Sequence, residues 1–283
     1  MPGDAFALWL LVIRTGLNVS ALVAIGFALH TALGIVERDG RPALMRSSLA
    51  ASLAVPIFAA ARLGVLTLQL GDGSTLFDPT AIALGWSTLG ASTIGLAAGA
   101  LLAAASAATR SRALAGAGAI ALAAGFALTG HTQGLDDPGL APLAVGLHVL
   151  VAGFWIAAPG TLRPSMAVTD NVLHARMVAF SKIAVAAIPV LAALGVWLAW
   201  RISGGIGPLL TSTYGRLMLL KLAAALAAMA LGAFNQQVIT ARVLSEPQTG
   251  RRWLSRTLAA ETALFLLAII AVSAATTIAG PGE

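Results

Sequence analysis

A histidine stands inside one of the most apolar stretches of the chain. His148 lies in the run Leu147–Trp155, which contains no charged residue. An ionisable side chain within an apolar segment of membrane length is costly and by default marks a functional site. His131 stands at the end of the preceding apolar run, and Asp136 and Asp137 lie between the two histidines. We therefore take this hairpin as the centre of the candidate site.

Metal binding is the chemistry that these residue types suggest. The chain has no cysteine, so a thiolate site is excluded, whereas imidazole, carboxylate and thioether groups can together bind copper. The candidate metal ligands are His131, Asp136, Asp137, His148 and Met218. His131 is expected at the membrane edge and His148 about 9–14 Å deeper, which indicates two stations along an access path. The spacing by itself is not a metal motif.

The composition places the chain in a membrane. Of its 283 residues, 58% are hydrophobic and only 10% are charged, whereas soluble domains have about 25% charged residues. The formal charge of +6 does not indicate nucleic acid, because the basic residues lie between apolar segments and not in one patch. No ATP site is recognisable. We expect a protein of the lipid bilayer that is not an enzyme.

Eight apolar segments are each long enough to cross a bilayer. They cover approximately residues 6–36, 44–70, 80–106, 112–130, 139–162, 176–201, 214–240 and 255–279, and the fourth is the shortest. The sequence therefore predicts an all-α polytopic membrane bundle with eight transmembrane helices. We divide it into residues 1–111, with segments one to three, and residues 112–283, with segments four to eight.

The orientation follows from the charges in the connections. The first, third, fifth and seventh connections hold arginines, whereas the second and fourth hold aspartates and no basic residue. Loops rich in lysine and arginine stay in the cytoplasm. Both termini are therefore predicted on the periplasmic side.

Four basic side chains share one depth in the outer half of the predicted bundle. Arg14, Arg62, His148 and Lys221 all lie about 9–14 Å from the outer ends of their segments. We expect segments one, two, five and seven to converge there on a polar pocket that opens outward. Snorkelling of Arg14 and Lys221 to the interface is the alternative.

Four more polar residues lie nearer the predicted inner side. Lys182 and Glu261 are each about 9 Å into their segments, which suggests a buried ion pair with Asn235 as a third member. His30 stands between two glycines on the inner third of segment one. For His30 we expect a hydrogen bond in helix packing and not a metal-ligand role.

Several short runs resemble the CopD family of copper-resistance and copper-uptake membrane proteins. The runs are Phe180–Ala184, Thr213–Leu222, Gly232–Asn235 and the basic turn Arg251–Arg256 that leads to Glu261, with Gly130–His131 and Leu147–Trp155 similar to the family's middle helices. The resemblance covers residues 120–280 well and the earlier helices only in general pattern.

This resemblance implies an inner-membrane protein of eight helices that handles copper. It points to His131 and His148 for the metal, and it leaves Lys221 and Glu261 as matched polar positions without a role. The chain is poor in methionine and ends without a soluble copper-binding domain, so a separate periplasmic copper chaperone is expected to supply the ion. Passage would be passive or coupled to another gradient. A homodimer is compatible with the sequence.

Two other functions remain open. His148 and Trp155 also resemble the histidine-containing helix of the membrane protoporphyrinogen oxidase family, whose members bind haem, and the cationic layer would accept the propionates of haem b. Such a redox protein would need a second histidine at the depth of His148, and neither His30 nor His131 is expected there. The remaining hypothesis is a scaffold that docks a periplasmic copper protein without binding the ion.

Overall fold

The chain folds into a bundle of helices, and the described residues include no strand. The structure is a computed structural model that describes residues 3–36, 42–71, 73, 75–129, 137–163 and 168–278. The long helices are α1 (Gly3–Ala32), α2 (Pro42–Leu70), α3 (Pro79–Thr109), α4 (Arg112–Ala127), α5 (Ala141–Ile156), α7 (Asp170–Ser203), α9 (Thr213–Phe234) and α11 (Pro247–Ile278). The short elements are α6 (Ala158–Thr161), α8 (Ile206–Thr211), the π-helix η1 (Asn235–Ile239) and α10 (Thr240–Ser245).

Seven helical stretches in the described part of the chain are long and apolar enough to cross a membrane. One of them, Thr213–Ser245, combines α9, η1 and α10. α4 has only 16 residues, about 24 Å of helix, whereas the hydrocarbon core of a bilayer is about 30 Å thick. The prediction of an all-helical, multi-pass membrane protein is confirmed. The predicted count of eight spanning helices is not confirmed.

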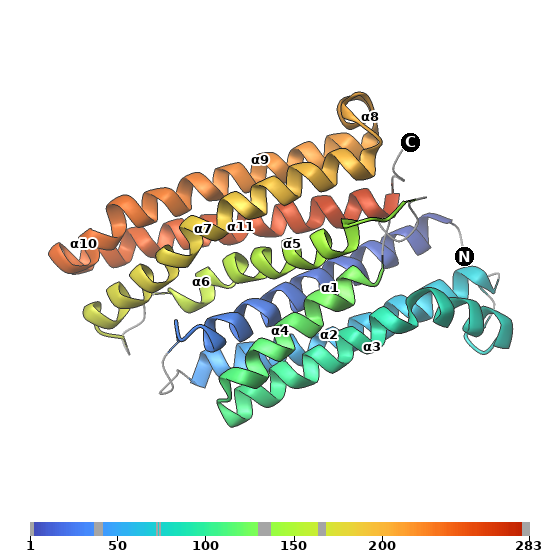
Figure 1. The fold of residues 1–283 in the computed structure, drawn as a ribbon, viewed down its shortest axis with the longest axis horizontal. Coiled ribbons are helices and arrows are strands. Elements are labelled where there is room, and N and C mark those ends of the chain that lie inside the picture. Colours follow the sequence, from blue (N-terminus) through green and yellow to red (C-terminus); the bar gives the residue numbers. More distant parts are fainter. Residues whose placement is uncertain are drawn as a thin grey trace.

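Two groups of helices lie side by side in the bundle (Figure 1). Buried residues of α1 to α4, among them Leu17, Val55 and Leu122, form one hydrophobic core. Residues of α5 to α11, among them Trp155 and Phe265, form the other. α1 and α5 join the groups, because they pack against each other while α1 also contacts α11 and α5 also contacts α4. The predicted division at residues 111 and 112 stays a prediction.

The helix starts follow from side-chain caps in the local sequence. The Asp78 carboxylate accepts a backbone hydrogen bond of 2.8 Å from the first turn of α3. Ser111, Thr169 and Ser212 cap α4, α7 and α9 in the same way. Capping residues of these types satisfy N–H groups that a helix start leaves without partners. They therefore fix where α3, α4, α7 and α9 begin, whereas Leu140 before α5 makes no such bond.

α1 and α5 cross in backbone contact at two glycines. A Cβ atom added to Gly26 would lie 2.1 Å from the carbonyl oxygen of Gly153, and one added to Gly153 would lie 2.6 Å from Cγ2 of Ile25. Small residues let membrane helices approach closely and gain packing energy where the hydrophobic effect between helices is absent. This crossing fixes the positions of His30, one turn after Gly26, and of His148, five residues before Gly153.

Candidate functional site

His148 lies on α5 and faces α7. A Cβ atom on Gly195 would be 3.2 Å from Cε1 of the imidazole, so this glycine leaves room for the ring. The imidazole also has a weak polar contact with the backbone of Leu191, one turn earlier on α7, outside ordinary hydrogen-bond geometry. Its Nδ1 atom is buried and has no hydrogen-bond partner. Because buried polar atoms are nearly always paired, this nitrogen is the part of the residue that a ligand would satisfy.

Lys221 of α9 is close enough to His148 for its charge to act on the imidazole. The predicted convergence of these two residues on one pocket stays a prediction. Met218, three residues earlier on α9, is buried instead in a cluster with Tyr214 and with Ala275 of α11. The structure does not place the thioether beside the imidazole.

Arg14 and Arg62 form a second pair, between α1 and α2, in which the charge of Arg14 acts on Arg62. Nη1 of Arg14 donates hydrogen bonds to the Thr276 carbonyl and to the Thr277 hydroxyl in the last turn of α11. Nη2 of Arg62 donates to the Thr129 hydroxyl, at 3.3 Å, just after α4. Both guanidinium groups thus lie at the carbonyl end of a helix, where its partial negative charge favours a cation.

The predicted polar layer therefore consists of two pairs. One joins α1 and α2 to the ends of α4 and α11, and the other lies among α5, α7 and α9. None of these four residues, Arg14, Arg62, His148 and Lys221, lines either of the described pockets. The common outward pocket that shared depth predicts is not among the described pockets, and it stays a prediction.

Glu261 is 2% exposed on α11 and is held by uncharged neighbours. Nδ2 of Asn235 donates to Oε1 of Glu261 at 2.8 Å, and the Thr257 hydroxyl donates to Oδ1 of Asn235 at 2.6 Å. Asn235 opens the π-helical segment of the α9 stretch, where its backbone carbonyl accepts a hydrogen bond from the Thr240 hydroxyl at 2.9 Å. Such π-bulges often mark functional positions in helices. The predicted contact between Asn235 and Glu261 is present.

The predicted ion pair between Lys182 and Glu261 is not formed. Lys182 is exposed and lines a groove with His174. The buried face of α7 includes Met177 and Phe180, and Lys182 follows Phe180 by two residues, about 200° around the helix. Equal depth along two helices does not fix the direction in which either side chain points, and here the lysine points outward.

The predicted acidic mouth is only partly described. His131 and Asp136 lie outside the described residues. Asp137 is exposed, and its backbone carbonyl accepts a hydrogen bond of 2.7 Å from Nη2 of Arg201 at the end of α7. Among the described residues no group of three or more histidine, aspartate or glutamate side chains is placed to hold a metal ion. His148 is thus a single candidate ligand, and its partners in the predicted set stay predictions.

His30 is a packing residue, as predicted. It is completely buried, and its Nε2 atom donates to the Phe154 carbonyl oxygen at 2.9 Å because a carbonyl can only accept. Its Nδ1 atom is 2.8 Å from the Thr161 hydroxyl. Phe154 and Thr161 lie at the end of α5 and in α6, so His30 ties α1 to the place where α5 ends. Neither ring nitrogen is left for a metal.

These histidines also bear on the haem alternative. Both nitrogens of His30 are used, and His174 lies in the groove with Lys182, away from His148. A bis-histidine haem site therefore finds no second ligand for His148 among the described residues. The haem alternative is not supported.

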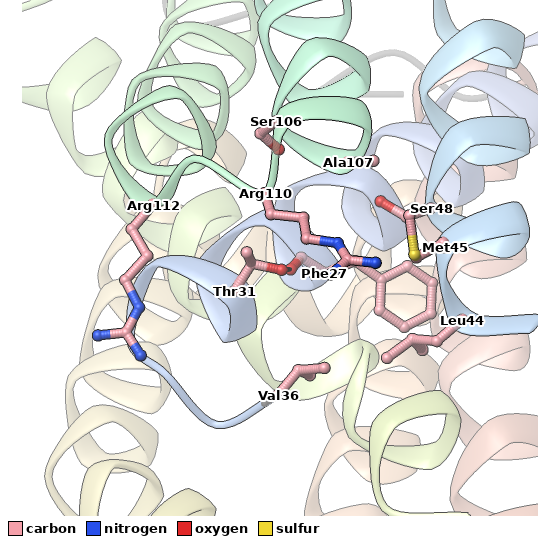
Figure 2. A pocket seen from close by; sticks show the side chains of 10 residues that line it. All are labelled: Phe27, Thr31, Val36, Leu44, Met45, Ser48, Ser106, Ala107, Arg110 and Arg112. Carbon is pink, nitrogen blue, oxygen red and sulfur yellow. Dashed lines mark hydrogen bonds between the residues drawn. The ribbon is translucent and has the colours of Figure 1, made fainter. Parts of the chain in front are cut away.

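A pocket that the sequence did not predict lies between the ends of α1, α2 and α3 and the start of α4 (Figure 2). It measures about 70 Å³ and is lined by Phe27, Thr31, Val36, Leu44, Met45, Ser48, Ser106, Ala107, Arg110 and Arg112. Figure 2 shows the Arg110 side chain extending toward Met45 and Ser48. Arg110 ends α3 with a left-handed φ of 57°, which is uncommon for a residue other than glycine. The sequence predicts for Arg110 and Arg112 only a place in a loop between two apolar segments.

Other site residues were missed because they act through small size or through the backbone. Gly195 makes room for His148, and Thr161 supplies the hydroxyl beside His30. For Gly195 the sequence shows only a glycine within an apolar helix. A glycine can occur there for several reasons, so its role beside His148 is not readable from the sequence. The partner of a buried histidine on another helix has no signal in the local sequence.

Comparison with known protein families gives a match. The family model of CopD, copper resistance protein D, matches residues 174–275, which run from the first turns of α7 into α11. No curated protein and no solved structure matches. The matched part contains Gly195, Lys221 and Glu261, whereas His148 precedes it. The resemblance to the CopD family of copper-resistance membrane proteins is thus confirmed over residues 174–275.

Proposed function

We propose that this protein is a copper-binding protein or copper permease of the bacterial inner membrane. Copper, the cargo, is taken from the periplasmic side and passes His148 within the bundle. In this proposal α4 is the eighth pass and both termini are periplasmic, which agrees with the start of α1 and the end of α11 lying at the same end of the bundle (Figure 1). A periplasmic copper chaperone delivers the ion.

The observation that carries the proposal is the buried, unpartnered Nδ1 atom of His148. Imidazole nitrogen is a good copper ligand, and this ring is held against α7, which belongs to the part that matches the copper-resistance family. His148 on α5 thus faces a helix that carries the family resemblance. His131, Asp136 and Asp137 remain the proposed earlier ligands along the path.

The charge of Lys221 favours passage over storage. When Lys221 carries its proton, its ammonium group opposes a cation at His148, because the charge acts on the same imidazole. A conducting site must bind its ion well enough for entry and weakly enough for release. Binding to a single nitrogen beside a lysine is therefore weak, as a transfer step requires.

The test replaces His148 with alanine and measures copper accumulation in cells that express the protein. We expect accumulation to fall to the level of cells without the protein, while the amount of folded protein in the membrane stays the same. His174→Ala is the matched control, because this histidine lines a groove without contact to His148, and it should leave accumulation unchanged. Unchanged copper in the His148→Ala cells would contradict the proposal.

Metal analysis and a visible spectrum of the purified protein separate the alternatives. Copper bound by the wild type and lost in His148→Ala agrees with the proposal. A protein that docks a copper chaperone as a scaffold would contain no copper, and a haem protein would show a Soret band.

A further inference from the structure

Arg14 and Arg62 bring two guanidinium groups together within the membrane-spanning part of the bundle. α1 and α2 are antiparallel neighbours that touch where a Cβ atom on Gly16 would lie 2.5 Å from Cε1 of Phe58. Arg14 precedes Gly16 by two residues and Arg62 follows Phe58 by four. Because the helices run in opposite directions, both steps lead toward the same end of the bundle, about 3 Å and 6 Å along the axes.

Most of the donors of this pair have no acceptor in the described part of the chain. Nη1 of Arg14 bonds to the end of α11, and Nη2 of Arg62 bonds to Thr129. The Nε atom of Arg14 is buried without a partner. A guanidinium group carries five N–H donors in a fixed fork, so each arginine retains N–H groups that point to neither helix end.

The charge of the pair is also not balanced. Neither arginine forms an ion pair with any carboxylate among the described residues. The carbonyl end of a helix contributes only about half an elementary charge, so the ends of α4 and α11 together offset about one of the two positive charges. The two groups act on each other, and like charges in a poorly solvated site repel strongly. An anion would remove this repulsion.

We propose that Arg14 and Arg62 form a binding site for a phosphate group between α1, α2 and the C-terminal end of α11. A phosphate group has enough acceptor oxygens to meet two guanidinium forks at once, whereas one fork already satisfies the two oxygens of a carboxylate. Thr129, Thr276 and Thr277 hold the two arginines in place.

The phosphate has two possible sources. It belongs either to the headgroup of an anionic phospholipid next to α1 and α2 or to free phosphate from solution. Guanidinium groups have no acceptor atom that could bind copper, so this site is separate from His148 and stands or falls independently of copper transport.

The experiment measures binding to the purified, delipidated protein by native mass spectrometry and by thermal unfolding. The probes are phosphatidylglycerol, diacylglycerol as its counterpart without phosphate, and inorganic phosphate with chloride as the salt control. Wild type is compared with Arg62→Gln, Arg14→Gln and Arg62→Lys. Arg201→Gln is the control, because Arg201 bonds to the Asp137 carbonyl at the end of α7.

We expect wild type and Arg201→Gln to bind the phosphate-bearing probes. Arg14→Gln and Arg62→Gln should bind them at least about tenfold more weakly. Arg62→Lys keeps the charge and should retain part of the affinity. Retained affinity in this variant would show that Arg62→Gln loses binding through the lost charge and not through misfolding. Binding of phosphatidylglycerol but not diacylglycerol identifies a lipid as the source, and stabilisation by inorganic phosphate alone identifies the solute. Equal binding by wild type and both glutamine variants, or no response to either phosphate probe, would overturn the proposal.

Discussion

Replacing His30 with alanine removes a completely buried ring and both of its hydrogen bonds. Interhelical hydrogen bonds in membrane proteins contribute about 0.6 kcal/mol on average and about 1.7 kcal/mol at most, so two bonds contribute about 1–3 kcal/mol. The ring also packs edge-on against Phe154 and Phe180, with centroids 4.9 and 5.7 Å away. The cavity adds roughly 2 kcal/mol, so we expect a total loss of about 3–5 kcal/mol.

The free energy of unfolding is measured in detergent micelles with increasing denaturant. Thr161→Val removes only the bond to Nδ1 at nearly constant volume and should cost about 0.6–1.7 kcal/mol. His174→Ala serves as the control on the surface of α7 and should be near neutral. If His30→Ala unfolds like the wild type yet loses bound copper, His30 is a metal ligand and the packing interpretation is wrong.

Two further predictions concern the helix contacts that position the site. Gly153→Val should prevent the close approach of α1 and α5, because even a Cβ atom would meet Ile25 at 2.6 Å, and size-exclusion profiles should show loss of folded protein. Gly207→Ala has no atom within 4 Å of its new methyl group and should leave that profile unchanged. Asn235→Leu should lower the free energy of unfolding by about 1–3 kcal/mol, because Glu261 loses its donor. An unchanged denaturation midpoint would show that this hydrogen bond adds nothing to stability.

The arrangement of α1 and α5 explains why the unmatched part of the chain matters to the proposed function. The family model covers residues 174–275, whereas His148 lies on α5. α5 packs against α7 on one side and against α1 on the other. The Gly26–Gly153 contact and His30 therefore hold the candidate ligand against the matched helices, and changes at this crossing should affect copper handling without touching the metal.

The sequence by itself determined the class of protein, the helices and most polar positions within them. Apolar runs of membrane length can be satisfied only as helices or closed barrels, because the bilayer offers backbone groups no hydrogen bonds. The resemblance around Phe180–Ala184 and Thr213–Leu222 was also readable from residues alone, and the family match confirms it. His30 was recognised as a packing residue from its place between glycines.

Only the tertiary structure decided which polar residues meet. Depth follows from counting residues along a helix, but the direction of a side chain depends on the rotation of that helix against its neighbours. Arg14 and Arg62 share both depth and direction, whereas Lys182 and Glu261 share depth alone, and the lysine faces outward. Rotation is set by contacts such as Gly26 against Gly153, which join residues more than a hundred positions apart and leave no pattern in either local sequence.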